Sequence, residues 1–113
     1  MSIKVNSGKF AGLRPTTRVI TNNLAFLDEF DFSVLIPSTE GTYDVRLPNN
    51  PLDGQEYWVE TFGANIEVSS QKQMWSHVNG EYEYSHTFSA RGVIRFKYYS
   101  EVITWTYSWV ESH

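Results

Sequence analysis

The histidines of this chain of 113 residues, and the carboxylates beside them, are the residues that could hold a metal ion. His77 and His86 stand on either side of an expected turn at Gly80, so facing strands would bring the two imidazoles together. A zinc site would need a third ligand, and Glu81 and Glu83 are the nearest candidates. Histidines at such a spacing are more often ordinary surface residues, so we predict that the protein holds no metal.

Pairs of carboxylates could provide the acid and the base of a glycosidase. The candidates alternate along expected strands: Glu56, Glu60 and Glu67, and Glu81 with Glu83. Alternate acids on a strand usually form its solvent face. A further acidic cluster, Asp28, Glu29 and Asp31, lacks the glycine-containing spacing of a calcium loop. Because phosphate-binding loops, nucleophile elbows and HExxH motifs are also missing, we predict that the protein is not an enzyme and uses no cofactor.

Aromatic rings offer a different chemistry, since an exposed ring can stack on a sugar. Trp75, Tyr82 and Tyr84 lie in the otherwise polar stretch 69–92 and form a possible sugar platform. The alternative is that these rings cover the end of the core or an oligomer interface, where Trp and Tyr are enriched. We favour the interface, and predict that Trp58, Phe62 and Trp75 contribute to it.

The composition places these residues in one small domain. Aromatic residues make up 16% of the chain, which is more ring surface than so small a core easily covers. The chain has no cysteine, so disulfides and thiolate chemistry are excluded. No apolar run reaches the roughly 18 residues of a membrane span. The first ten residues lack the apolar core of a signal peptide, so we expect a protein made in the cytoplasm, with no membrane partner.

Charge divides the chain into two unequal parts. The net charge is −4, yet all 13 acidic residues follow residue 18. We predict two units: residues 1–18 as an extended basic N-terminal arm, and residues 19–113 as a single β domain. The predicted attachment residues of the arm are Lys4, Lys9, Phe10, Leu13, Arg14 and Arg18. A solvated tail is the alternative reading of the arm, and the acidic body disfavours nucleic acid as a partner.

From Phe30 onwards the sequence has the patterns of β-strands. Tyr43–Leu47 alternates apolar and polar residues, which is typical of a half-buried strand, whereas Glu56–Phe62 carries apolar groups on both faces, which indicates a central strand or a subunit contact. Leu24–Phe30 has weak helical character, and a loop or a single turn fits it equally well. About eight short strands predict an antiparallel β-sandwich or jelly-roll, with a small barrel as the alternative.

The C-terminal region predicts a hairpin in which Val93–Tyr99 and Val102–Val110 are joined by Ser100-Glu101. The expected partners are Tyr98 with Ile103, Phe96 with Trp105, and Ile94 with Tyr107. One face is then wholly apolar, while the other carries Lys97 and Arg95 opposite threonines. Ser-Glu is not a preferred two-residue turn, so a longer loop is the alternative.

The segment from Leu47 to Val68, LPNNPLDGQEYWVETFGANIEV, combines these strand and turn signals. A strand ends in Leu-Pro, a turn of Pro, Asn, Asp and Gly follows, then the strand EYWVETF, and Gly-Ala-Asn separates it from a third strand, IEV. This pattern resembles a meander that recurs in virion proteins of tailed bacteriophages, in fibre, tail-tip and capsid decoration domains.

The resemblance implies a non-enzymatic, commonly trimeric virion protein whose partner is the major capsid protein or another virion protein. Because the sequence begins with Met and contains no long repetitive shaft, we expect a protein that decorates or stabilises the capsid as a homo-oligomer. The alternative is a fibre or tail tip domain that serves viral attachment by binding a receptor or a host surface glycan. A small hydrolase is a further alternative, which the missing catalytic motifs disfavour. The resemblance supplies no functional residue.

Overall fold

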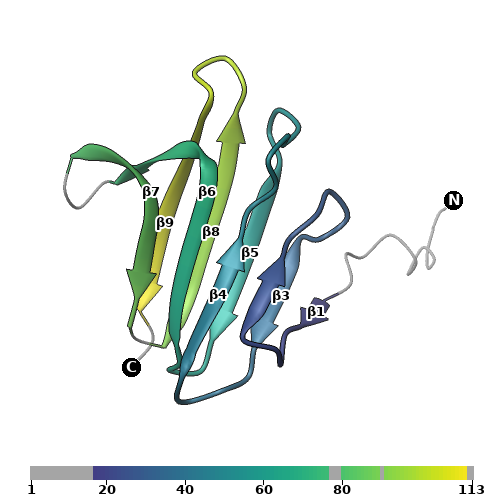
Figure 1. The fold of residues 1–113 in the computed structure, drawn as a ribbon, viewed down its shortest axis with the longest axis vertical. Coiled ribbons are helices and arrows are strands. Elements are labelled where there is room, and N and C mark those ends of the chain that lie inside the picture. The colour runs from purple at the N-terminus through teal and green to yellow at the C-terminus, as the bar shows by residue number, and fades with distance from the viewer. Residues whose placement is uncertain (1–16, 77–79, 90, 112–113) are drawn as a thin grey trace, which may run out of the picture.

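A computed structural model describes residues 17–76, 80–89 and 91–111 of the chain (Figure 1). These residues form nine strands and no helix. The strands are β1 (Thr17–Val19), β2 (Leu24–Phe26), β3 (Ser33–Ile36), β4 (Thr42–Arg46), β5 (Glu56–Thr61), β6 (Asn65–Ser76), β7 (Glu81–Phe88), β8 (Gly92–Tyr99) and β9 (Thr104–Glu111). The described part of the chain therefore has no helix that is long and apolar enough to span a membrane.

The first six strands wind as a flattened coil. β1, β3 and β5 pair in parallel, and β2, β4 and β6 form a second parallel set. Short turns carry the chain from the first set to the second, and the connections after β2 and β4 carry it back. Gly41 and Gly63, in two of the short turns, have φ values of 87° and 130°, which L-residues with a side chain rarely adopt.

The last three strands close the coil on one side. β8 and β9 form an antiparallel hairpin that extends the sheet from β5, and β7 pairs antiparallel with β6. β6 changes partner along its length: Asn65–Ser69 pairs with β4, and Gln73–Trp75 pairs with β9. Its register with β7 shifts between Ser69 and Met74, so the strand bends there and the whole sheet curls into a half-barrel.

The core lies inside the curl and is built from alternate residues of each strand. In β5, Tyr57, Val59 and Thr61 are buried, while Trp58 and Glu60 point outwards. The coil contributes mainly aliphatic side chains to this core, and β8 and β9 contribute mainly aromatic ones. The largest fully buried side chains are those of Trp105, Tyr57, Phe96, Ile36, Ile66, Met74 and Ile94.

The predicted all-β class is confirmed, but the sandwich or jelly-roll is not. The described strands belong to one curled, mixed sheet rather than two antiparallel sheets. The difference arises because the strands of the coil pair in parallel. Parallel partners are not joined by a tight turn, so the sequence does not mark which strands are neighbours. The helical alternative for Leu24–Phe30 is wrong, since Leu24–Phe26 is β2 and Asp28–Asp31 forms a turn.

The C-terminal hairpin is present with the predicted faces but a different register. Tyr98 pairs with Trp105, Phe96 with Tyr107 and Ile94 with Trp109. The connection is the longer loop, Ser100 to Ile103, and a shift of two residues keeps the apolar side chains of the paired strands on their predicted face. Ile103, which was predicted opposite Tyr98, is instead exposed in the loop. Phe96, Trp105 and Tyr107 are buried, as predicted.

The predicted arm lies mostly outside the described residues. Lys4, Lys9, Phe10, Leu13 and Arg14 all belong to residues 1–16. Arg18, the last residue of the predicted arm, lies in β1, where its guanidinium forms an ion pair with Asp31 at 2.8 Å.

Candidate functional site: the outer face of the curled sheet

The outer face of β1, β3, β5, β8 and β9 carries a row of apolar side chains. The register places Val19 beside Leu35, Leu35 beside Glu60, Glu60 beside Val93, and Val93 beside Val110. Val19 is 55% exposed and Val110 is 61% exposed, while Leu35 and Val93 are half-buried. We call these four apolar residues the outer row.

A groove runs along one end of the outer row. It has a volume of about 440 Å³, and Phe62, Arg91, Val93 and Val110 are among its lining residues. Phe62 is 42% exposed, so the groove continues the apolar surface past the end of β5. Two charged side chains, Glu60 and Arg91, border the same groove. Glu60 thus interrupts the apolar strip between Leu35 and Val93, and Arg91 lies at its margin; such a mixture suits a protein partner.

Trp58 occupies the neighbouring position on the same face. Its ring centroid lies 6.1 Å from that of Phe32, and the Arg95 guanidinium carbon lies 4.5 Å above the indole. Glu56 approaches Arg95 at 3.8 Å. The indole is still 39% exposed, so Trp58 extends the outer row in a second direction while its orientation is fixed by Arg95.

The structure brings two of the three predicted interface residues together. Trp58 and Phe62 both border the outer row. Trp75 lies on the same outer face, beside Thr106, but β8 and β9 separate it from Trp58. It is half-buried, and its ring contacts that of Tyr82 edge-on, with centroids 5.1 Å apart. Trp75 is thus a neighbour of the row and not part of it.

The possible sugar platform is open but uneven. Tyr82 and Tyr84 are both more than half exposed on β7. The rings of Trp75 and Tyr82 meet at 66°, so they do not make one flat stacking surface. A sugar would therefore stack on a single ring of this group.

His86, from the histidine candidate, takes part in a polar cluster. His86 Nδ1 lies 3.1 Å from Glu83 Oε2, and the Tyr107 hydroxyl donates a 2.7 Å hydrogen bond to the same carboxylate oxygen. Ser76 also hydrogen-bonds Glu83. His77 lies outside the described residues, and among the residues placed by the structure no group of three metal-binding side chains occurs.

The Glu83 carboxylate is the centre of this cluster. Burial acts to raise its pKa, but the hydrogen bonds from Tyr107 and His86 outweigh that effect and hold the pKa below its ordinary value. Burial raises the pKa of Tyr107 to about 12. The partnership between Glu83 and Tyr107 was not predicted from the sequence, because it joins β7 to β9 across β6. The one available signal was an acid at an inward-facing strand position.

The glycosidase candidates of β5 and β6 lie at outward-facing positions, whereas Glu83 of β7 faces inward. Glu60 is on β5 and Glu67 is on β6, and both are exposed. These strands belong to different parallel sets of the coil. Glu56 is partly engaged with Arg95, as described above. The alternate acids of β5 and β6 thus lie on the solvent faces of their strands.

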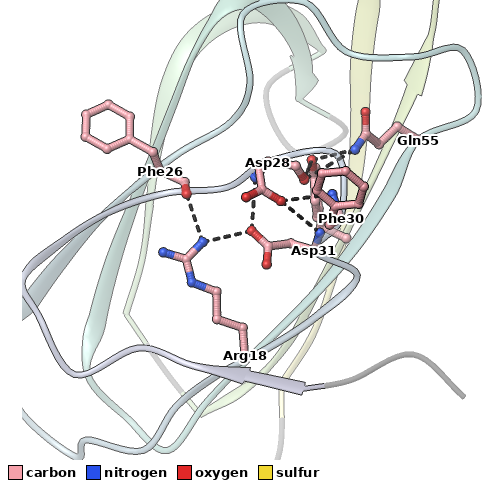
Figure 2. Close-up of polar contacts among 7 residues, drawn as sticks. Arg18, Phe26, Asp28, Phe30, Asp31 and Gln55 are labelled. Carbon is pink, nitrogen blue, oxygen red and sulfur yellow. Dashed lines mark hydrogen bonds and ion pairs between the residues drawn. The ribbon is translucent and has the colours of Figure 1, made fainter. Parts of the chain in front are cut away.

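The acidic cluster 28–31 stabilises a loop (Figure 2). The Asp31 carboxylate accepts hydrogen bonds from the Arg18 guanidinium at 2.8 Å and from the Asp28 amide at 2.9 Å. The Asp28 carboxylate in turn accepts one from the Phe30 amide at 2.9 Å. The Tyr57 hydroxyl donates to the Asp28 carbonyl at 2.6 Å, and burial raises the pKa of that hydroxyl. The two aspartates are therefore loop-forming residues.

Comparison with known proteins gives no match: no family model, curated protein or solved structure is similar to this chain. What bears on its function is therefore the geometry of the molecule.

Proposed function

We propose that this protein is a non-enzymatic structural protein of a tailed-phage virion that decorates or stabilises the capsid as a homo-oligomer, with a trimer as the expected form. The observation that supports self-association is the outer row. The pattern LPNNPLDGQEYWVETFGANIEV supports the virion setting, with the major capsid protein or another virion protein as the further partner.

The outer row supports a self-contact for an energetic reason. Removing apolar surface from water stabilises an interface by roughly 25 cal/mol per Å². Val19 and Val110 lie at the two ends of the row, so both the β1 edge and β9 would take part in the contact. Glu60 lies within the row, between Leu35 and Val93, and Arg91 lines the same groove. In a closed ring the acid of one copy would face the base of the next.

Light scattering on matched variants tests the oligomer. Val110→Lys places a charge in the row and should convert the oligomer to a 13.1 kDa monomer. Thr87→Lys is the control, because Thr87 is exposed on β7, away from the row. A wild-type protein that stays monomeric at micromolar concentration would reject the proposed homo-oligomer.

The alternative function is a fibre or tail tip domain that binds a receptor or a host surface glycan. Its support is the exposure of Tyr82 and Tyr84 beside Trp75. Titration with host surface polysaccharide, followed by tryptophan fluorescence, tests it. Tyr82→Ala should abolish any binding at this platform, whereas Tyr99→Ala, which removes an exposed ring from β8, should leave it unchanged.

A further inference from the structure

Four large apolar side chains are exposed at one end of the strands, where the β2–β3, β4–β5 and β8–β9 connections come together. These connections lie at the upper ends of the strands in Figure 1. Phe30 is 88% exposed, and Leu52, Val102 and Ile103 are each more than half exposed. Three acids stand beside them in the same loops: Glu29, Asp53 and Glu101. We call these seven residues the loop end.

Hydrogen bonds hold the three loops of the loop end in place. Gln55 joins two of them, because its side chain accepts a bond from the Leu52 amide at 3.0 Å and donates one to the Asp28 carbonyl at 3.4 Å. The Ser100 amide donates to the Asp53 carboxylate at 2.9 Å, which joins the third loop to the second. The apolar side chains are thus presented on a pre-organised surface, which lowers the entropy lost on binding.

Charge limits what this surface can bind. The acids of the loop end would repel nucleic acid and anionic lipid, and favour a partner that is apolar and basic. Asp53 keeps its negative charge, since the backbone hydrogen bond from Ser100 lowers the pKa of its carboxyl.

Residues 1–16 of the chain have the complementary composition. They contain Lys4, Lys9 and Arg14 and no acid, together with Ile3, Val5, Phe10 and Leu13. They also join the described fold beside the loop end, because Thr17 pairs with Ser33, two residues after Asp31. Arg18 already pairs a basic side chain from this part of the chain with an acid of the β2–β3 connection, since it forms an ion pair with Asp31.

We propose that the loop end is a binding site for residues 1–16 of a second copy of this chain, held by the four apolar side chains and by Glu29, Asp53 and Glu101. The inference rests on the proposed homo-oligomer and identifies which virion protein receives the arm. In an oligomer the arm of one copy would then fasten its neighbour.

Crosslinking between two single-cysteine variants tests the contact, and the natural chain contributes no competing thiol. Isotope-labelled Ser7→Cys chain is mixed with unlabelled Val102→Cys chain and treated with a short bismaleimide. The expected product joins labelled to unlabelled chain. The matched control replaces Val102→Cys by Thr87→Cys, an exposed site on β7, and should give about tenfold less product, in proportion to the lower effective concentration.

Charge provides the second measurement. The double variant Glu29→Lys, Glu101→Lys should lower the crosslink yield about tenfold, as should raising the salt concentration to about 1 M with the unaltered acids in place. Glu67→Lys, an exposed acid on β6, is the matched control and should leave the yield unchanged. The salt titration needs no charge-reversal variant, so it stays informative if the double variant fails to fold.

Two results would overturn the inference. The first is equal crosslinking at positions 102 and 87. The second is a double variant, Ser7→Cys with Val102→Cys, that crosslinks only within single chains. Either result leaves the proposed homo-oligomer intact, because that is decided separately by the mass of the wild-type protein and of Val110→Lys. If residues 1–16 bind another virion protein instead, the Ser7→Cys chain gives no more product with the Val102→Cys chain than with the Thr87→Cys chain, which is the first of these results.

Discussion

The coil and the hairpin fill one core in different ways. The coil, β1 to β6, presents mostly aliphatic side chains such as Val34, Val45 and Val59, whereas the hairpin, β8 and β9, presents Phe96, Trp105 and Tyr107. The rings of the hairpin span the interior of the curl, and Trp105 lies with its centroid 5.7 Å from that of Tyr57 in the coil. The coil thus contributes a mainly aliphatic layer of the core, and the hairpin contributes its large aromatic side chains.

This difference predicts that the hairpin carries the larger single contributions to stability. Trp105→Ala should lower the free energy of unfolding by about 3–5 kcal/mol, because it empties a fully buried site between Tyr57 and Tyr98. Denaturant titration measures the loss. Trp105→Phe, which keeps a ring in place, should cost clearly less. A loss below about 1 kcal/mol for the alanine variant would mean that Trp105 is not central to the core.

The coil should respond more weakly to the same kind of change. Val45→Ala removes two buried carbon groups from β4 and should cost about 2 kcal/mol in the same titration. Asp44→Ala, at the preceding position on the outer side of β4, is the control and should lower the free energy of unfolding by under about 0.5 kcal/mol. If Val45→Ala lowered the free energy of unfolding as much as Trp105→Ala, the predicted difference between the coil and the hairpin would be wrong.

The hairpin and the coil also differ in how far their strand pairing could be predicted from the sequence. The hairpin is local, so alternation of residues from Ile94 to Tyr107 identified its strands and faces, and only the loop length shifted the register. The coil is non-local. Ser33 pairs with Trp58 and Thr42 with Asn65, and no single tight turn joins such parallel partners to mark the pairing. Strand patterns therefore predicted β4 and β5, but they missed β2 and did not show how the strands of the coil assemble.

The candidate sites divide in the same way. Trp58 and Phe62 were found from one strand, because Glu56–Phe62 is apolar on both faces. The outer row combines residues from four strands, of which Val19 and Val110 stand at opposite ends of the described sequence. The loop end likewise depends on three connections meeting in space. Neither surface has a contiguous motif, so neither was visible before the pairing was known.

A smaller change in stability is expected for a substitution in the loop between β8 and β9. Ile103 has a φ of 52°, a left-handed conformation that a β-branched residue adopts only under strain. Ile103→Gly should therefore raise the free energy of unfolding by about 0.5–1 kcal/mol, net of the entropy that glycine adds to the unfolded chain. It should also weaken crosslinking between Ser7→Cys and Val102→Cys chains. Val102→Gly, at the neighbouring position without this strain, is the control and should bring no gain in stability.

The smallest change in stability should come from the hydrogen bond between Glu83 on β7 and Tyr107 on β9. The pKa of Glu83 is lowered in the folded protein, so the unfolded chain binds the proton more readily. The carboxylate then contributes stability that is complete above the pKa of the unfolded chain and disappears as the pH falls through the folded value. For a carboxyl group this places the loss between about pH 5 and about pH 3.

A comparison with Glu83→Gln isolates this contribution from the other carboxyl groups, which titrate in the same range. The wild-type protein should have the higher thermal midpoint at neutral pH, and the difference should shrink as the pH falls from about 5 to about 3. Tyr107→Phe removes the 2.7 Å hydrogen bond that helps to lower the pKa, so it should move the loss of stability to higher pH. A difference between wild type and Glu83→Gln that stays constant over this range would show that the carboxylate charge does not stabilise β7 against the hairpin.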